Sequence, residues 1–197
     1  MAVDDLIRFG RYLGSLKELE RTGWVRMRIP RPESVADHSF RTAVLAMILA
    51  PQYGADQLKA IKMALIHDIG EAIIGDIVTE QGAKVSKGLL KSKVAREKKA
   101  VRKIMSLVGT EDFYALFEEF EKNRTPEARL VKQIDKLEMA LQAYEYEKMH
   151  GKDLEEFFKT ARHRVRDKPM LKVLAELDIM RASERKLVHR SRGRRGS

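Results

Sequence analysis

Cysteine is absent from the 197 residues of this chain. Its absence excludes disulfide bonds, catalysis by a thiolate, and zinc sites built on cysteine sulfur. Any metal site in the protein must therefore use nitrogen and oxygen ligands, which come from histidine, aspartate, glutamate and backbone or amide carbonyl groups.

Long apolar runs are also missing. No segment reaches the roughly 18 apolar residues that a membrane-spanning helix needs, and residues 1–5 lack the basic and apolar segments of a secretory signal. We therefore expect a cytoplasmic protein with no membrane contact. Hydrophobic residues make up 44% and charged residues 35% of the chain, as in globular domains. We expect one domain over residues 1–190, followed by a basic, disordered tail at 191–197.

Positive charge is concentrated in two segments, although the whole chain has a formal net charge of +10. Residues 84–103 carry nine Lys or Arg against one Glu, and residues 181–197 carry seven against one. The rest of the chain has a net charge of −4, so the isoelectric point alone does not indicate a nucleic-acid-binding protein. Both segments can be solvated surfaces. Alternatively, Lys84 or Lys87 reaches a substrate phosphate, and the tail attracts nucleic acid without specificity.

Helical periodicity dominates the sequence, and no run alternates convincingly between apolar and polar residues as strands do. We therefore expect an all-α protein. Gly23, Pro30 and Pro32 indicate a non-helical stretch over residues 21–34. The expected helices cover residues 6–19, 34–50, 56–69, 91–108, 112–122, 126–150, 153–166 and 170–189.

The helix expected over residues 56–69 is apolar nearly all round after Lys62, which is typical of a buried helix. It ends in the pair His67-Asp68. A buried ionised carboxylate is costly unless it is paired or binds a metal ion. One interpretation of the pair is structural, with a capping Asp beside a core His that bonds a backbone carbonyl. The other interpretation is a metal site.

Two further residues favour the metal site. His38 begins the apolar face of the preceding helix, and Asp135 adjoins the apolar stripe of the helix over 126–150. Asp135 also lies between Lys132 and Lys136, so a surface salt bridge is its alternative role. Two imidazoles and two carboxylates suit one Mn²⁺, Co²⁺, Fe²⁺, Ni²⁺ or Zn²⁺ ion, with Mg²⁺ as a further candidate. Four protein ligands leave coordination positions for water and substrate.

The order and spacing of these residues resemble the signature of HD phosphohydrolases: His38, then His67-Asp68 after 28 residues, then Asp135 after a further 66. From residue 6 to about 175, the chain resembles the 5′-deoxynucleotidase branch of these proteins. The resemblance implies a compact helical bundle, a homodimer, and hydrolysis of deoxynucleoside 5′-monophosphates with Co²⁺ or Mn²⁺. Four segments carry the resemblance: RTGWV at 21–25, RPESVADH at 31–38, ALIHDIGEAIIGD at 64–76 and QIDKLEMALQAYEYE at 133–147.

The resemblance also implies roles for individual residues. The catalytic carboxylate of the family corresponds to Glu71, one helical turn beyond the His-Asp pair, and a second carboxylate near the substrate corresponds to Asp76. Glu71 could instead be an exposed residue at a helix end, and Asp76 could cap a turn before Thr79. The metal ligands of the family correspond to His38, His67, Asp68 and Asp135.

The sugar-contacting tryptophan of the family corresponds to Trp24, the single Trp of the chain, which could equally be a core residue. In several bacterial members the residue before this Trp is an arginine that helps to bind phosphate, whereas this chain has Gly23. The departure leaves open what binds phosphate and what selects deoxyribose. Arg21, Arg26 and Arg28 are the candidates to replace that arginine.

These patterns predict a metal-dependent phosphomonoester hydrolase, in which activated water attacks phosphorus and Glu71 relays a proton. Alternatives inside the family are hydrolases of nucleoside triphosphates, cyclic dinucleotides or alarmones. Outside it, the chain could be a basic helical nucleic-acid-binding protein, or a structural metal protein with an inactive site. The former does not explain a buried His-Asp pair, and Glu71 argues against the latter.

Overall fold

Helices make up nearly all of the regular structure, and this confirms the expected all-α class. The computed structural model describes residues 1–81, 84–109 and 111–193. Two strands of two residues each form a small antiparallel hairpin. The elements are α1 (Val3–Glu18), α2 (Thr22–Arg26), α3 (Val35–Leu49), the 3₁₀ turn η1 (Ala50–Tyr53), α4 (Gln57–Ile66), α5 (Glu71–Ile74), β1 (Glu80–Gln81), β2 (Lys84–Val85), α6 (Lys87–Val108), α7 (Glu111–Lys122), α8 (Pro126–His150), α9 (Glu155–Arg164) and α10 (Lys168–Gly193).

Local capping signals determine where the helices that build the site begin. At α3, Asp37 N donates to Ser34 Oγ (3.1 Å) and Ser34 N donates to Asp37 Oδ2 (2.9 Å), which is a reciprocal capping box. At α8, the Thr125 side chain accepts from the third residue of the helix and Pro126 occupies its first turn. Gly151 ends α8 with a φ of 62°.

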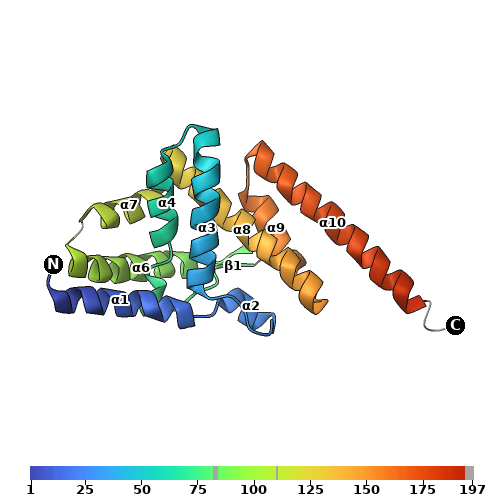
Figure 1. Ribbon diagram of the computed structural model, residues 1–197, viewed down its shortest axis with the longest axis horizontal. Helices are drawn as coiled ribbons and strands as arrows, with labels where there is room; N and C mark the ends of the chain where they lie inside the picture. Colours follow the sequence, from blue (N-terminus) through green and yellow to red (C-terminus); the bar gives the residue numbers. More distant parts are fainter. Residues whose placement is uncertain (82–83, 110, 194–197) are drawn as a thin grey trace.

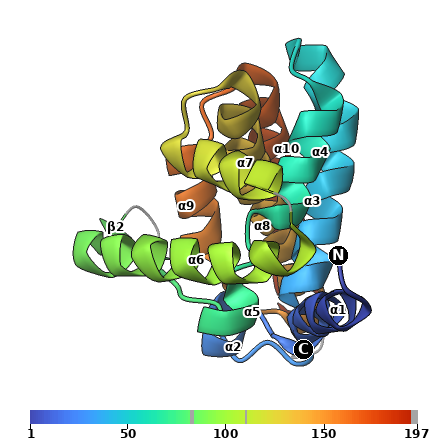
Figure 2. The same cartoon turned by 90° about the vertical axis from the view of Figure 1, so that its left-hand side faces the viewer.

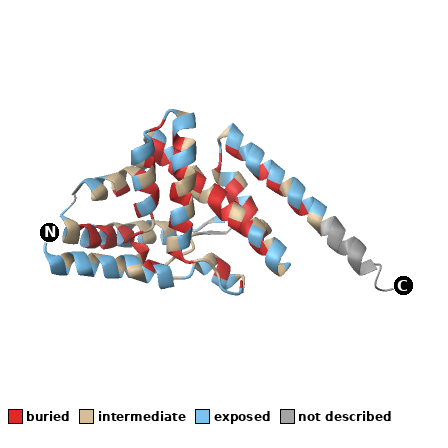
Figure 3. Ribbon diagram, viewed as in Figure 1, coloured by how far each residue is buried: buried red, intermediate tan, exposed pale blue. Residues whose placement is uncertain are grey.

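Helix α8 lies at the centre of the bundle and packs against α3, α4, α7, α9 and α10. Figure 1 shows α3 and α4 crossing it, α1 and α6 running side by side at one end, and α10 extending away from the body. In Figure 2, α6 lies between α7 and the short α5. Buried residues gather along α8 and on the inner faces of α3, α4 and α6 (Figure 3). The site therefore forms between α3, α4, α5, α6 and α8.

Several expectations about the elements need correction. The stretch expected to be non-helical contains α2, a five-residue helix. Helix α4 was expected to extend to residue 69 but ends at Ile66, so His67 and Asp68 follow it. This helix is not buried all round after Lys62, because Leu65 is 51% exposed.

The ends of the chain and of α6 also differ from expectation. Helix α6 begins at Lys87, four residues before the expected start. Residues 191–193 belong to α10, whereas 194–197 lie outside the described residues, so the disordered tail stays a prediction. Among the described residues, no helix combines the length and the low charge needed to cross a membrane.

Candidate functional site

Three helices bring the predicted metal ligands to one place. His38 lies in the first turn of α3, His67 and Asp68 directly follow α4, and Asp135 lies in α8. His38 Nε2 is 3.3 Å from Asp135 Oδ1 and 3.9 Å from Asp68 Oδ2. His67 Nε2 is 3.2 Å from Asp68 Oδ2. Residues separated by up to about a hundred positions in the chain therefore meet in the interior.

Both imidazole rings are held by their Nδ1 atoms. His67 Nδ1 lies 2.6 Å from the backbone oxygen of Ala64, and His38 Nδ1 contacts Glu138 Oε2. Arg41 Nε donates to the other oxygen of Glu138 at 2.8 Å, which fixes that carboxylate in turn. A histidine whose Nδ1–H is bonded in this way presents a lone pair on Nε2, as in metal-binding histidines.

The two Nε2 atoms test whether a metal ion fits. Both are buried, and neither forms a hydrogen bond with any described residue. One ligand atom from each of His38, His67 and Asp135 lies within 4.8 Å of the others. Imidazole nitrogens beside carboxylate oxygens are the donors that a divalent transition metal prefers. The residues therefore fit a single divalent ion.

The carboxyl groups of Asp68 and Asp135 are ionised. Burial opposes the charge of Asp68, but His67, Lys93 and Arg21 outweigh burial and lower its pKa well below the usual range. Burial also opposes the charge of Asp135, and the lysine that follows it on α8 and a nearby imidazole lower its pKa well below that of an ordinary aspartate. Both oxygen ligands are therefore anionic at neutral pH.

The protonation of His38 bears on metal binding. Burial and Arg21 oppose the positive charge of His38, but Glu138 and Asp135 outweigh them and raise its pKa to about 10. A metal ion that binds Nε2 must therefore displace a proton from this ring.

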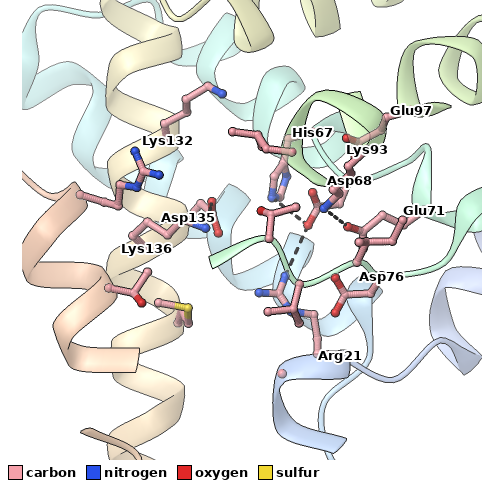
Figure 4. Close-up of a pocket in the computed structure, with 18 of the residues that line it drawn as sticks. Arg21, His67, Asp68, Glu71, Asp76, Lys93, Glu97, Lys132, Asp135 and Lys136 are labelled. Atoms are coloured by element: carbon pink, nitrogen blue, oxygen red, sulfur yellow. Dashed lines mark hydrogen bonds and ion pairs between the residues drawn. The ribbon is translucent and has the colours of Figure 1, made fainter. Parts of the chain in front are cut away.

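A cavity of about 580 Å³ opens beside these residues and is lined in part by Asp68 and Asp135. Figure 4 shows Asp68, Glu71 and Asp76 on one side of it and α8 on the other, with Lys132 and Lys136 projecting from that helix. A cavity of this size admits a small polar ligand.

Glu71 begins α5 and is 2% exposed, so its alternative role as an exposed helix end is wrong. Its Oε1 accepts a hydrogen bond from Lys93 Nζ at 2.8 Å, and its buried Oε2 has no hydrogen-bond partner among the described residues. Burial, then the charge of Asp68, raise the pKa of Glu71 well above its usual value although Lys93 opposes them.

Asp76 has a structural contact that the sequence did not indicate. Its Oδ2 accepts a hydrogen bond from Thr22 N at 2.7 Å, and its backbone oxygen accepts one from Thr22 Oγ1 at 2.9 Å. It therefore caps α2 and not a turn before Thr79. The side chain still lines the cavity, beside Arg21.

Trp24 is mostly a core residue. It is 1% exposed, stacks on Phe157 with ring centroids 4.2 Å apart, and donates from Nε1 to Glu33 at 2.8 Å. The same ring explains Gly23, because a Cβ there would lie 3.1 Å from Phe157 Cε1. An arginine at position 23 would have to displace Phe157. Trp24 also lines the cavity.

Among the basic candidates for phosphate binding, Arg21 is the best placed. Its Nη1 is 3.4 Å from Asp68 Oδ2 and it lines the cavity. Arg26 also lines the cavity but pairs with Glu156. The described lining residues include neither Arg28 nor Lys84, and Lys84 is exposed on β2.

Comparison with known proteins identifies the family of the chain. A family model described as HD domain matches residues 13–185. The chain belongs to the HD domain family. It is similar to 5′-deoxynucleotidase HDDC2 of Danio rerio, at 38% identity over 185 residues that cover 91% of this chain and 90% of the relative. It is also similar to 5′-deoxynucleotidase hdd1 of Schizosaccharomyces pombe, at 38% identity over 157 residues, 77% of this chain and 78% of the relative.

A solved structure shares the fold. A conserved protein from Pyrococcus furiosus has a TM-score of 0.70 and 36% identity, with 87% of this chain and 98% of that chain covered. The resemblance to HD phosphohydrolases that the motif spacing indicated is therefore confirmed, and with it the membership of this chain among HD domain proteins.

Three residues of this HD domain site were missed by sequence reasoning: Glu138, Arg41 and Lys93. Glu138 lies three residues after Asp135, on the same face of α8, so helical spacing could have indicated it. Lys93 is 22 residues from Glu71, and only the packing of α6 on α5 brings them together.

Proposed function

We propose that this HD domain protein is a metal-dependent 5′-deoxynucleotidase, which hydrolyses deoxynucleoside 5′-monophosphates to deoxynucleosides and phosphate. One observation carries the proposal: two buried histidine Nε2 atoms, which have no hydrogen-bond partner within the described part of the chain, lie next to two ionised carboxylates beside the cavity. The relatives named as 5′-deoxynucleotidases span most of the chain and support this substrate class.

His38, His67, Asp68 and Asp135 would hold the divalent ion, which would supply Lewis acidity toward a phosphate ester and would lower the pKa of water toward about 7 to 9. Arg21 lies at the same end of the cavity and is proposed to bind a phosphate oxygen, in place of the arginine that Gly23 replaces. Its charge also stabilises the negative charge that develops on the phosphoryl group.

Glu71 is proposed to move the proton. Burial and the charge of Asp68 raise its pKa above that of an ordinary glutamate, which favours the protonated carboxyl group that can donate to the departing 5′-oxygen. The oxygen available for this transfer is Oε2, since Oε1 is bound to Lys93. Asp76 and Trp24 are proposed to border the sugar, because both line the cavity.

Phosphate release from a panel of deoxy- and ribonucleoside monophosphates tests the proposal, with Co²⁺, Mn²⁺, Mg²⁺ or EDTA present. We expect turnover of the deoxynucleotides with Co²⁺ or Mn²⁺ and none with EDTA. Asp68→Ala should lose both metal binding and turnover, whereas Glu71→Ala should keep the metal and lose rate. Equal turnover with EDTA and with Co²⁺ would contradict the proposal.

We also propose that the protein is a homodimer in the cytoplasm, where nucleotides are interconverted. Large apolar side chains exposed on the adjacent helices α3 and α4 support a self-association surface: Phe40 is 68% and Leu65 51% exposed. Light scattering should give twice the chain mass of 22.6 kDa, and a monomeric mass would retire the dimer.

A further inference from the structure

Lys93 enters the site from α6, a helix that contributes none of the four proposed metal ligands. Its Nζ lies 2.8 Å from Glu71 Oε1, and the two side chains are 16% and 1% exposed. An ammonium group buried this deeply needs a hydrogen-bond acceptor, and Glu71 Oε1 provides one. The contact therefore fixes both side chains.

The contact with Lys93 makes the two carboxyl oxygens of Glu71 different. Oε1 is occupied by Lys93, whereas Oε2 is buried without a hydrogen-bond partner in the described part of the chain. A carboxylate held by one oxygen has little freedom to rotate, so the free oxygen keeps one position beside the cavity that Glu71 lines. Figure 4 shows Lys93 between Asp68 and Glu71.

Close packing of α5 on α6 brings the pair together. A Cβ on Gly70 would lie 2.9 Å from Glu97 Cγ and 3.1 Å from Val101 Cγ2. Glu97 and Val101 follow Lys93 at intervals of four residues, so the three side chains share one face of α6. The absence of a side chain at Gly70 lets Glu71, the next residue, reach the first member of this face.

We propose that Lys93 is a positioning residue for catalysis, which holds Glu71 by Oε1 so that Oε2 is presented for proton transfer. The proposal rests on the proposed function, in which Glu71 transfers a proton to the departing oxygen. A salt bridge with a purely structural role would affect stability alone, whereas a positioning residue affects kcat through Glu71.

The test uses Lys93→Met, which keeps the aliphatic stem, Lys93→Arg, which keeps the charge, and Lys91→Met as a matched control exposed on the same helix. With saturating Mn²⁺ and a deoxynucleoside monophosphate, Lys93→Met should lower kcat about 10- to 100-fold. KM and the Mn²⁺ affinity should change less than about threefold, Lys93→Arg should keep most of the rate, and Lys91→Met should match the wild type.

A second arm asks whether Lys93 acts through Glu71. In a Glu71→Gln background, Lys93→Met should cause no further loss of kcat, because the group that it positions is already gone. The positioning role would be overturned, with the proposed function intact, by either of two results. One is a double variant whose loss of kcat is the product of the two single losses. The other is an unchanged kcat in Lys93→Met. Absence of phosphate release by the wild-type protein with every nucleotide and metal would overturn the proposed function itself, and this proposal with it.

Discussion

The ring of His38 is held in place by two residues that are not proposed metal ligands. The ring is fully buried, its Nδ1 contacts Glu138, and Arg41 holds the far oxygen of that carboxylate. A carboxylate behind a ligating histidine orients the ring and increases the basicity of the free nitrogen. We therefore expect Glu138 to affect metal affinity through the ring of His38.

Glu138→Gln tests this role, because glutamine keeps the shape but loses the charge that Nδ1–H faces. We expect the affinity for Co²⁺, measured by isothermal titration calorimetry, to fall about 10- to 100-fold. Glu145→Gln is the control, since Glu145 is on the same helix and also pairs with Arg41 at 2.9 Å but is half exposed. Equal loss in both variants would contradict a specific role for Glu138.

Glu97 should make stability depend on pH. Burial, opposed by Lys93, raises the pKa of this 5% exposed residue to about 8, whereas a glutamate in the unfolded chain titrates near about 4.3. The folded state binds the proton more tightly, so the free energy of unfolding falls as pH rises between these two values.

Glu97→Gln should remove that dependence. In urea unfolding, the variant should be about 1 to 3 kcal/mol more stable than the wild type at pH 8.5 and similar to it at pH 5. The reason is that glutamine mimics the protonated acid, which the folded state prefers. A stability difference that is the same at both pH values would rule out titration of Glu97 as its cause.

At the scale of the elements, helices with local start and stop signals were predictable from sequence. The expected and observed bounds of α8 agree, since Pro126 in its first turn and Gly151 directly after its last residue are local signals. Helix α2 was missed because its N-terminus is capped by Asp76, 54 residues away. A five-residue helix that depends on a distant partner has too little periodicity to detect.

Within the site, too, local features were predictable from sequence, whereas contacts between distant residues were not. His38, the His67-Asp68 pair and Asp135 stood out because polar residues on apolar helical faces need partners. The contacts of Glu71 with Lys93 and of Arg21 with Asp68 join residues 22 and 47 positions apart, and their geometry exists only after the helices pack.

Gly70→Ala tests the packing of α5 on α6. The added Cβ would lie 2.9 Å from Glu97 Cγ, so α5 must move away. We expect a loss of about 1 to 3 kcal/mol in the free energy of unfolding, with a lower kcat as Glu71 leaves Lys93. Gly14→Ala in α1 is the control: a Cβ there meets nothing within 4 Å, and it should gain about 0.5 to 1 kcal/mol. Wild-type stability and rate in Gly70→Ala would contradict the close contact.

At the scale of the molecule, the bundle brings together the proposed metal ligands of α3, of the segment after α4 and of α8. Helices α3, α4 and α8 pack against one another, and α10 is attached by Arg181, whose guanidinium lies 2.7 Å from Glu147 and 2.9 Å from Glu155. The proposed ion therefore links helices from the first and second halves of the chain, with Asp135 as the ligand from α8.

Metal stoichiometry in the wild type and in Asp135→Ala tests the central claim most directly. Co²⁺ titrated into the metal-free protein should bind at one ion per chain, and Asp135→Ala should weaken that binding by more than about 100-fold while the fold, monitored by circular dichroism, is retained. Binding of Co²⁺ by Asp135→Ala as tightly as by the wild type would contradict the account.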